Sequence, residues 1–308
     1  MTVVVGADGF VGGALASALG AVRVVFGPAR EAGDTPFDEA GVLLSGADVV
    51  VNASGFRVRP GLCAADYRRT HTETVARLIP ALAPGSLLIH VSSASVLGRS
   101  PGSLPHNDEA GSPETFGCPD YAIAKRDAER AARAAASERG VRLAILRPAI
   151  LYGRVPDGMI GTLTALAARG VLLRLVPARH RHHLCALPLL VETVRAVARR
   201  GHAIETPLTV ADPFFVTSGE IVGVVREIHG PAVSLPFPAG VAGAVLRRFP
   251  RSSSPRLDLR TWGEILCILA LDTVYDTAET YRLLGIDVSR FSRPRTWERL
   301  ARGQEAEA

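Results

Sequence analysis

Short apolar runs alternate with segments of helical periodicity through the first half of the chain. The first run, Thr2–Val5, is followed by a glycine-rich loop and by a pattern that predicts a helix at residues 10–19. The longest helical pattern is the alanine-rich segment 121–137. Strands that alternate with helices and are apolar throughout are typical of a parallel sheet covered on both faces. The further strand-like runs are residues 22–26, 47–54, 86–93 and 141–148.

The second half of the chain has a less regular pattern. Residues 160–170 and 188–201 have helical patterns, and residues 207–212 predict a late strand. Beyond it, helices are separated by proline-containing stretches such as 234–240. We predict an α/β fold: a Rossmann-type, doubly wound parallel sheet with a smaller, mostly helical C-terminal substrate lobe. The predicted dinucleotide-binding domain takes residues 1–153 and about 184–212, and the lobe takes residues 154–183 and 213–308.

Three glycines punctuate the loop between the first strand and the first helix. Gly6, Gly9 and Gly12 provide the tight turn and the close backbone approach that a bound pyrophosphate needs. The N-terminus of the following helix adds unpaired N–H donors and positive potential. The loop therefore predicts a dinucleotide site, and we interpret Asp8, inside the loop, as a cap for the helix.

The end of the second strand favours NADP(H). An acidic residue at this point usually binds the ribose 2′-hydroxyl of NAD, but here the strand ends in Phe26 and Gly27. Arg30 follows and suits a 2′-phosphate, while Asp34 is expected to meet the adenine side. NAD(H) is left open as the second cofactor.

A tyrosine and a lysine share one face of the predicted helix 121–137. Lys125 follows Tyr121 by four residues and is the only lysine in the chain, which otherwise uses arginine. An ammonium beside a phenol is expected to lower the pKa of the phenol from about 10 toward neutrality. Such a tyrosine can act as a general acid or base.

These segments together resemble the extended short-chain dehydrogenase/reductase family, which includes NAD-dependent epimerases and dehydratases. The matching stretches are the glycine loop, "ADVVVNASG", "HVSSASVLG", "YAIAK" and "LRPAILYG", and they cover about residues 1–155 well. The resemblance implies a catalytic set of Ser93, Tyr121 and Lys125, with Lys125 also binding the nicotinamide ribose. Leu97 stands where the family usually has tyrosine. The resemblance also implies that the loop from Pro148 to Leu151 lines the nicotinamide. Together with the residues discussed above, the expected cofactor contacts are Gly6, Gly9, Phe10, Val11, Gly12, Arg30, Asp34, Ala53, Ser54, Tyr121, Lys125, Pro148, Ile150 and Leu151.

The residues after the matched serine separate the family's branches. Sugar-nucleotide dehydratases carry an Asp-Glu pair there, whereas this chain has Ala94 and Ser95, so water elimination is not expected. We expect an NADPH-dependent ketoreductase that acts on a small-molecule ketone of nucleotide-sugar or secondary-metabolite type. A sugar-nucleotide epimerase with retained NAD and a non-catalytic NADP-binding regulator stay open as alternatives. The expected substrate contacts are Ser93, Ser95 and Arg181.

The amino-acid composition limits the classes of partner that we expect. The net charge of +5 is modest, and the arginine clusters lack interleaved aromatic residues, so no nucleic-acid partner is expected. The four cysteines stand far apart without metal-ligand spacing, so no metal is expected. The chain begins directly with a strand pattern, and its apolar runs are too short to span a membrane. We expect a cytoplasmic protein without a membrane partner, and a homodimer through the helices at 72–83 and 121–137 stays open.

Overall fold

A seven-stranded parallel sheet forms the centre of the computed structural model. The structure describes residues 1–59, 61–99, 103–104, 112–153, 163, 171–229, 233–250 and 259–291. The strand order is β11-β7-β5-β4-β1-β2-β3. The strands are β1 (Thr2–Val5), β2 (Val22–Val25), β3 (Asp34–Pro36), β4 (Val49–Asn52), β5 (Leu87–Val91), β7 (Arg142–Pro148) and β11 (Ile204–Val210).

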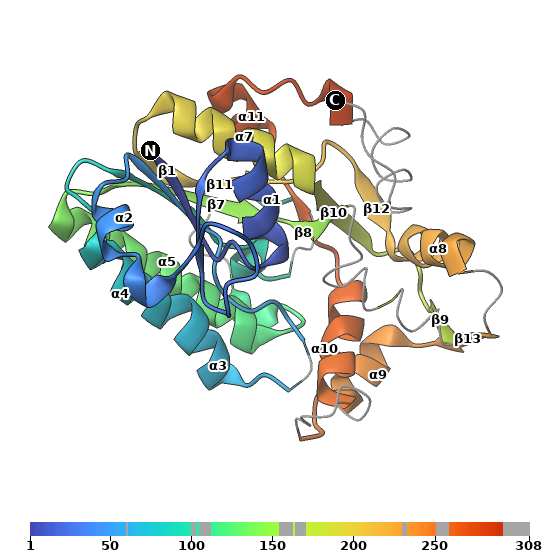
Figure 1. Ribbon diagram of the computed structural model, residues 1–308. Coiled ribbons are helices and arrows are strands. Elements are labelled where there is room, and N and C mark those ends of the chain that lie inside the picture. Colours follow the sequence, from blue (N-terminus) through green and yellow to red (C-terminus); the bar gives the residue numbers. More distant parts are fainter. Residues whose placement is uncertain are drawn as a thin grey trace.

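Helices cover both faces of this sheet, as Figure 1 shows. Because side chains alternate along a strand, successive residues of β1 point to opposite faces of the sheet. Val4 of β1 packs in the core beneath α1 and α7, while its neighbours Val3 and Val5 pack in the core beneath α4 and α5. The predicted doubly wound α/β fold is therefore confirmed. The helices on the two faces are α1 (Phe10–Leu19), α7 (Leu187–Arg200) and α11 (Ala278–Leu284), opposite α2 (Gly41–Ser45), α3 (Ala64–Arg68), α4 (Thr74–Leu78) and α5 (Pro119–Arg139).

The strand order reverses beside β1, and this reversal positions the site. From β1 the chain moves outward to β2 and β3, then returns to place β4 on the other side of β1. In open parallel sheets, the crevice at such a switch point, beyond the carboxyl ends of the strands, is where ligands bind. The loops after β1, β4, β5 and β7 all reach this edge.

The remaining elements form smaller sheets and a helical pair beside the main sheet. Strand β10 (Arg181–Ala186) links β8 (Ile150–Tyr152) to β12 (Phe215–Thr217), which leads into α8 (Ser218–His229). Helices α9 (Ala239–Leu246) and α10 (Leu259–Leu269) pack on each other. Two strand pairs complete the set: β9 (Val171–Leu175) with β13 (Val233–Phe237), and β6 (Ser103–Leu104) with β14 (Val274–Tyr275).

The six strands predicted from the pattern are present in the main sheet, but the pattern did not predict β3, β6, β8, β9, β10, β12, β13 and β14. The segments assigned to a mostly helical lobe therefore also contain strands β9, β12, β13 and β14. Strand β3 was missed because its three residues contain proline and aspartate, which are rare in strands. Helix α11, assigned to the C-terminal lobe from sequence, packs against α7 and β11 of the main sheet. The helix predicted at 160–170 lies almost wholly outside the described residues.

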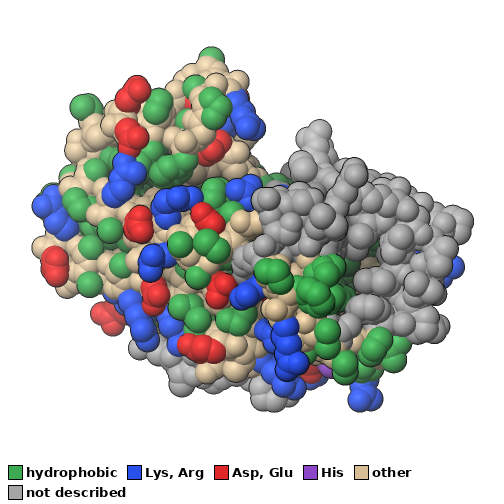
Figure 2. Space-filling view, turned by 90° about the horizontal axis from the view of Figure 1, so that it is seen from below, with side chains coloured by type: hydrophobic (Ala, Val, Ile, Leu, Met, Phe, Trp, Pro, Cys, Tyr) green, Lys and Arg blue, Asp and Glu red, His purple; other side chains and the backbone are tan. Residues whose placement is uncertain are grey.

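The described surface in Figure 2 mixes acidic, basic and apolar side chains over the visible face. Such interspersed charge is the pattern of an ordinary solvated surface. In the part of the chain that the structure describes, no helix combines the length and the apolar character needed to span a membrane.

Candidate active site

A cavity of about 730 Å³ lies at the switch point of the sheet. Its volume falls within the range of about 300–1,000 Å³ that is typical of small-molecule sites. The loops after β1, β2, β4, β5 and β7 and the start of α5 supply most of its wall. The expected site residues found in that wall are Gly6, Gly9, Phe10, Val11, Arg30, Ala53, Ser54, Ser93, Ser95, Tyr121, Lys125, Pro148, Ile150 and Leu151.

The glycine loop has the close packing that its sequence predicts. Gly6 has a φ of +84°, and a Cβ on it would lie 2.8 Å from Ser54 Cα. A Cβ on Gly12 would lie 2.0 Å from the carbonyl oxygen of Gly6, so this glycine allows α1 to contact the loop and is not itself in the cavity wall. Gly9, at the N-terminus of α1, has no side-chain cap and does line the cavity. A backbone cradle of this kind at a helix N-terminus fits a dinucleotide pyrophosphate.

Asp34 is absent from this wall, which corrects the expectation that it meets the adenine. Its side chain is 1% exposed and accepts hydrogen bonds from Arg23 Nε at 2.6 Å and from the Arg30 backbone N–H at 2.9 Å. The hydrogen bond from Arg23 is the main reason that the pKa of Asp34 falls to about 2. Asp34 therefore fixes the loop after β2 and leaves the Arg30 side chain to line the cavity.

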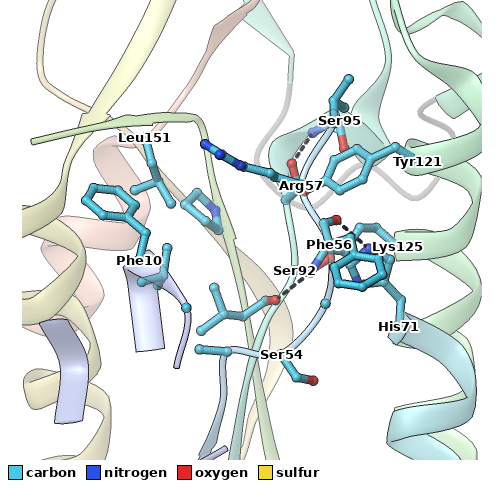
Figure 3. A pocket seen from close by; sticks show the side chains of 18 of the residues that line it. Phe10, Ser54, Phe56, Arg57, His71, Ser92, Ser95, Tyr121, Lys125 and Leu151 are labelled. Carbon is cyan, nitrogen blue, oxygen red and sulfur yellow. Dashed lines mark hydrogen bonds between the residues drawn. The ribbon is translucent and has the colours of Figure 1, made fainter. Parts of the chain in front are cut away.

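Ser93 and Tyr121 meet at the opposite end of the cavity. Ser93 caps the short 3₁₀ turn Ala94–Leu97, and its hydroxyl accepts the Ser95 backbone N–H at 3.2 Å. The Tyr121 side chain lies near enough to Ser93 for the serine hydroxyl to lower the pKa of the phenol. Figure 3 shows Tyr121 and Ser95 on the same side of the cavity. Two hydroxyl groups are thus available to one small ligand atom in front of them.

The pKa of Tyr121 differs from the sequence-based expectation. Burial raises it to about 12, and the Ser93 hydroxyl offsets only part of that rise. Lys125 was expected to lower this pKa, but its ammonium turns toward β5 and donates to the Val91 carbonyl oxygen at 3.1 Å. Tyr121 therefore holds its proton at neutral pH and is suited to donate it to an oxygen that gains negative charge.

Lys125 is enclosed one helical turn beyond Tyr121. It is 5% exposed, and burial lowers its pKa to about 8, against an opposing contribution from Glu129. Glu129 itself is held by Arg147, with the closer nitrogen–oxygen distance 2.6 Å, and accepts the Ser92 hydroxyl at 2.5 Å. These buried contacts among Ser92, Glu129 and Arg147 connect α5 with the ends of β5 and β7. They therefore fix the position of Lys125 in the cavity wall.

The imidazole ring of His71 packs against the ring of Tyr121. It lies in the π-helical turn Arg69–Glu73, and its ring stands edge-on to Tyr121 with centroids 5.6 Å apart. Its Nε2 is 3.0 Å from the Phe56 carbonyl oxygen, which can only accept, so Nε2 carries the proton. Burial lowers the pKa of His71 well below its ordinary value, so the imidazole is neutral. Single π-helical turns within α-helices are frequent at functional sites.

Two arginines in the wall were not expected from the sequence. Arg57 and Arg59 follow β4 in the stretch Phe56–Arg59, and both line the cavity. Figure 3 shows Arg57 reaching across the cavity toward Leu151. Partial burial, followed by the charge of Arg59, lowers the pKa of Arg57. The alternation of two arginines directly after a predicted strand was a signal that could have pointed to them.

Arg181 lies outside this wall, which corrects the expectation of a substrate contact. Its guanidinium pairs with Asp272 at 3.3 Å and sits 5.5 Å from the centre of the Phe215 ring. The cationic groups that do line the cavity are Arg30, Arg57, Arg59 and Lys125. Asp8 is the one acid among the described lining residues. The wall is therefore strongly positive and suits an anionic ligand.

A comparison with known families and structures gives a consistent result. The profile of the NAD dependent epimerase/dehydratase family matches residues 2–175. No curated protein matches the chain significantly. Many solved structures share the fold. The structure of the human epimerase family protein SDR39U1 with NADPH has a TM-score of 0.74 and 18% identity, covering 98% of this chain and 99% of that one.

Two further structures hold NAD together with a nucleotide sugar. MoeE5 with UDP-glucuronic acid and NAD has a TM-score of 0.68 and 20% identity, with 92% of each chain covered. UDP-glucuronic acid 4-epimerase from Bacillus cereus with UDP-glucuronic acid and NAD has a TM-score of 0.68 and 17% identity, covering 93% of this chain and 94% of that one. At these identities the likeness shows the fold alone.

Proposed function

The chain belongs to the NAD dependent epimerase/dehydratase family, and from this premise we propose that it is a reductase of anionic carbonyl compounds. One observation carries the proposal: Ser93 and Tyr121 line the same cavity as Lys125, which lies one helical turn beyond Tyr121. A nicotinamide dinucleotide, when bound, supplies or accepts the hydride that this site needs.

In this proposal each residue of the set has a separate task. Ser93 donates a hydrogen bond to the substrate carbonyl oxygen and orients it. Tyr121 donates its proton to that oxygen as the carbonyl carbon is reduced, and the phenol regains a proton from solvent. The raised pKa of Tyr121, about 12, keeps it protonated until the oxygen becomes a strong base. Lys125 supplies positive charge and hydrogen-bond donors for the nicotinamide ribose.

The substrate class follows from the charge of the wall. Arg57 and Arg59 stand on the loop after β4, and both side chains line the cavity. Arginine is the residue best shaped for paired hydrogen bonds to carboxylate or phosphate. We propose that these two arginines hold the anionic group of a keto acid or of a phosphorylated ketone.

The form of the cofactor depends on two charges at the other end of the cavity. Arg30 lines that end and supports NADP(H), the form expected from the sequence. Asp8 lines the same end and opposes a 2′-phosphate. The balance between these two side chains decides which dinucleotide binds more tightly.

A sugar-nucleotide epimerase is the second candidate, and the same pair of arginines favours it. A nucleoside diphosphate is also an anion that arginines bind well. An epimerase returns the hydride to the same molecule and so retains its dinucleotide, whereas a reductase exchanges it. Mass spectrometry of the ligand released from purified protein separates the two: abundant NAD indicates the epimerase, and no dinucleotide indicates the reductase.

The direct test of the reductase uses a matched panel of keto acids and their neutral esters. We expect the protein to oxidise NADH or NADPH with a keto acid and to do so faster than with the matching ester. The Tyr121→Phe variant serves as the control for reactions that do not need the site. A parent protein that binds a dinucleotide but consumes none with any ketone, and oxidises none of the matching alcohols, would overturn the proposal.

A further inference from the structure

Asp8 does not cap α1, although its place in the glycine loop predicts that role. The N-cap of α1 is Gly9, and it has no side-chain hydrogen bond. The Asp8 carboxylate turns toward the residues that follow β2. It accepts the Gly27 backbone N–H at 3.1 Å and lies 3.5 Å from the backbone nitrogen of Phe26.

This contact places a carboxylate where the second strand itself has none. In dinucleotide-binding sheets, an acid at the end of the second strand accepts the ribose 2′-hydroxyl of NAD. Here β2 ends at Val25, and the two residues that follow, Phe26 and Gly27, carry no acid. Asp8 reaches the same point from the neighbouring loop, and both Asp8 and Phe26 line the cavity.

The carboxylate is oriented by these backbone N–H groups and can still accept further hydrogen bonds. An ionised carboxylate offers about four lone-pair sites, and the backbone donors of Phe26 and Gly27 use two of them. A Cβ on Gly27 would lie 3.2 Å from Asp8 Oδ2, so the loop closes tightly around this oxygen. The remaining lone pairs can accept ribose hydroxyls, whereas a 2′-phosphate would place a like charge beside the carboxylate.

Arg30 is the opposing group, and its position is less fixed. Its backbone N–H is bound by Asp34, but its side chain is exposed along the cavity wall. An exposed, solvated cation is screened and contributes little unless its geometry is fixed. Asp8 is exposed as well, but the Gly27 backbone N–H donates to its carboxylate at 3.1 Å, so its charge is the better positioned of the two.

We propose that Asp8 selects the cofactor: it accepts the hydroxyls of the adenosine ribose and excludes a 2′-phosphate, so that the protein binds NAD(H) in preference to NADP(H). This reverses the preference expected from the end of the second strand. It rests on the proposed function only in requiring that the cavity binds a nicotinamide dinucleotide.

The test is a calorimetric titration of NADH and NADPH into the parent, Asp8→Asn and Asp38→Asn proteins. The parent is expected to bind NADH about tenfold or more tightly than NADPH. Asp8→Asn keeps the side-chain shape and removes the charge, so it is expected to weaken NADH binding and strengthen NADPH binding, lowering their ratio by about tenfold or more. Asp38→Asn makes the same charge change at an exposed acid paired with Arg77, outside the cavity wall, and is expected to leave the ratio unchanged.

The possible results separate this proposal from the proposed function. Tighter binding of NADPH by the parent, or an unchanged ratio in Asp8→Asn, would overturn the role of Asp8 and leave the reductase proposal standing. Binding of neither dinucleotide to the parent would overturn both. No turnover is measured, so an unsuitable substrate cannot imitate either result.

Discussion

The two ends of the cavity differ in how their charges are held. At the α5 end, defined by Ser93, Tyr121 and Lys125, burial shifts the pKa of Tyr121 to about 12 and that of Lys125 to about 8. At the β2 end, defined by Asp8, Phe26 and Arg30, all three residues are exposed. Proton transfer needs groups whose pKa the protein controls, and desolvation provides that control. Selection between two dinucleotides needs only a charge of the right sign at the right place.

The difference comes from the elements that support each end. A helix of 21 residues and the buried Glu129–Arg147 ion pair position the α5 end. Hydrogen bonds from the backbone N–H groups of Gly27 and Arg30 to the carboxylates of Asp8 and Asp34 position the β2 end. We therefore expect substitutions at the α5 end to change turnover and substitutions at the β2 end to change cofactor choice.

The largest expected effect is that of Tyr121→Phe. Loss of the proton donor is expected to reduce turnover by about 10²–10⁴-fold. Dinucleotide affinity is expected to stay near the parental value, because the aromatic ring is retained. Tyr67→Phe removes a hydroxyl from the adjacent ring, 5.7 Å away and outside the cavity wall, and is the matched control. Steady-state kinetics and a cofactor titration measure both quantities. Near-parental turnover in Tyr121→Phe would show that Tyr121 is not the proton donor.

Lys125→Arg is expected to have the next largest effect. The substitution keeps the charge but puts a larger, planar head into a site that is 5% exposed. Turnover is expected to fall by about tenfold or more, with dinucleotide binding weakened as well. Arg130→Lys, at an exposed position of the same helix, is the control for general effects on α5. Circular dichroism checks folding, and a folded Lys125→Arg variant with parental kinetics would show that any cation suffices there.

Arg57→Gln and Arg59→Gln are expected to raise KM for an anionic ketone by about tenfold each. A lost charge-assisted hydrogen bond has roughly this effect, and kcat should change less because the α5 end is intact. The neutral ester of the same ketone supplies the control, since its KM should not move. Equal losses for the acid and the ester would mean that these arginines support the loop and do not contact the substrate anion.

The smallest expected effect is the pH dependence of dinucleotide binding. Lys125 has its pKa lowered by burial to about 8, so it is a cation below that pH and neutral above it. Binding of NADH is therefore expected to weaken a few-fold as pH rises from about 7 to 9.5. The free protein should gain stability over the same rise, because above about pH 8 the unfolded state, with its ordinary lysine pKa near 10.4, binds more protons.

The Lys125→Arg variant supplies the control for this titration. Arginine does not lose its proton in this range, so the residual affinity of the variant should be flat with pH. A parental titration that is also flat would mean that the ammonium of Lys125 does not contribute to dinucleotide binding.

The two ends also differ in how well the sequence predicted them. The spacing of Tyr121 and Lys125 is local, and a helix fixes their relation once it forms, so both were found at the cavity. Asp34 and Asp8 were misassigned because their partners are remote: Asp34 binds Arg23 of the neighbouring strand, and Asp8 binds Gly27 across the loop. Which side chain a loop carboxylate will pair with depends on tertiary packing that no local pattern contains.

Arg57 and Arg181 show the same limit for the substrate side. Arg181 was expected to contact the substrate, yet it pairs with Asp272, far along the chain, and lies outside the cavity wall. Arg57 lies directly after β4, at the edge of the sheet where ligands bind, and could have been placed there from the strand prediction alone.

In the proposed reaction a hydride passes to a carbonyl carbon and Tyr121 provides the proton. The most direct test uses a reduced dinucleotide with both hydrogens at the nicotinamide C4 replaced by deuterium, with the best keto acid of the panel and either the parent protein or Tyr121→Phe. We expect the parent to transfer one deuterium to the new alcohol carbon, and Tyr121→Phe to do so on the same face but about 10²–10⁴-fold more slowly. An alcohol product without deuterium, or equal rates in the two proteins, would contradict the proposed reaction.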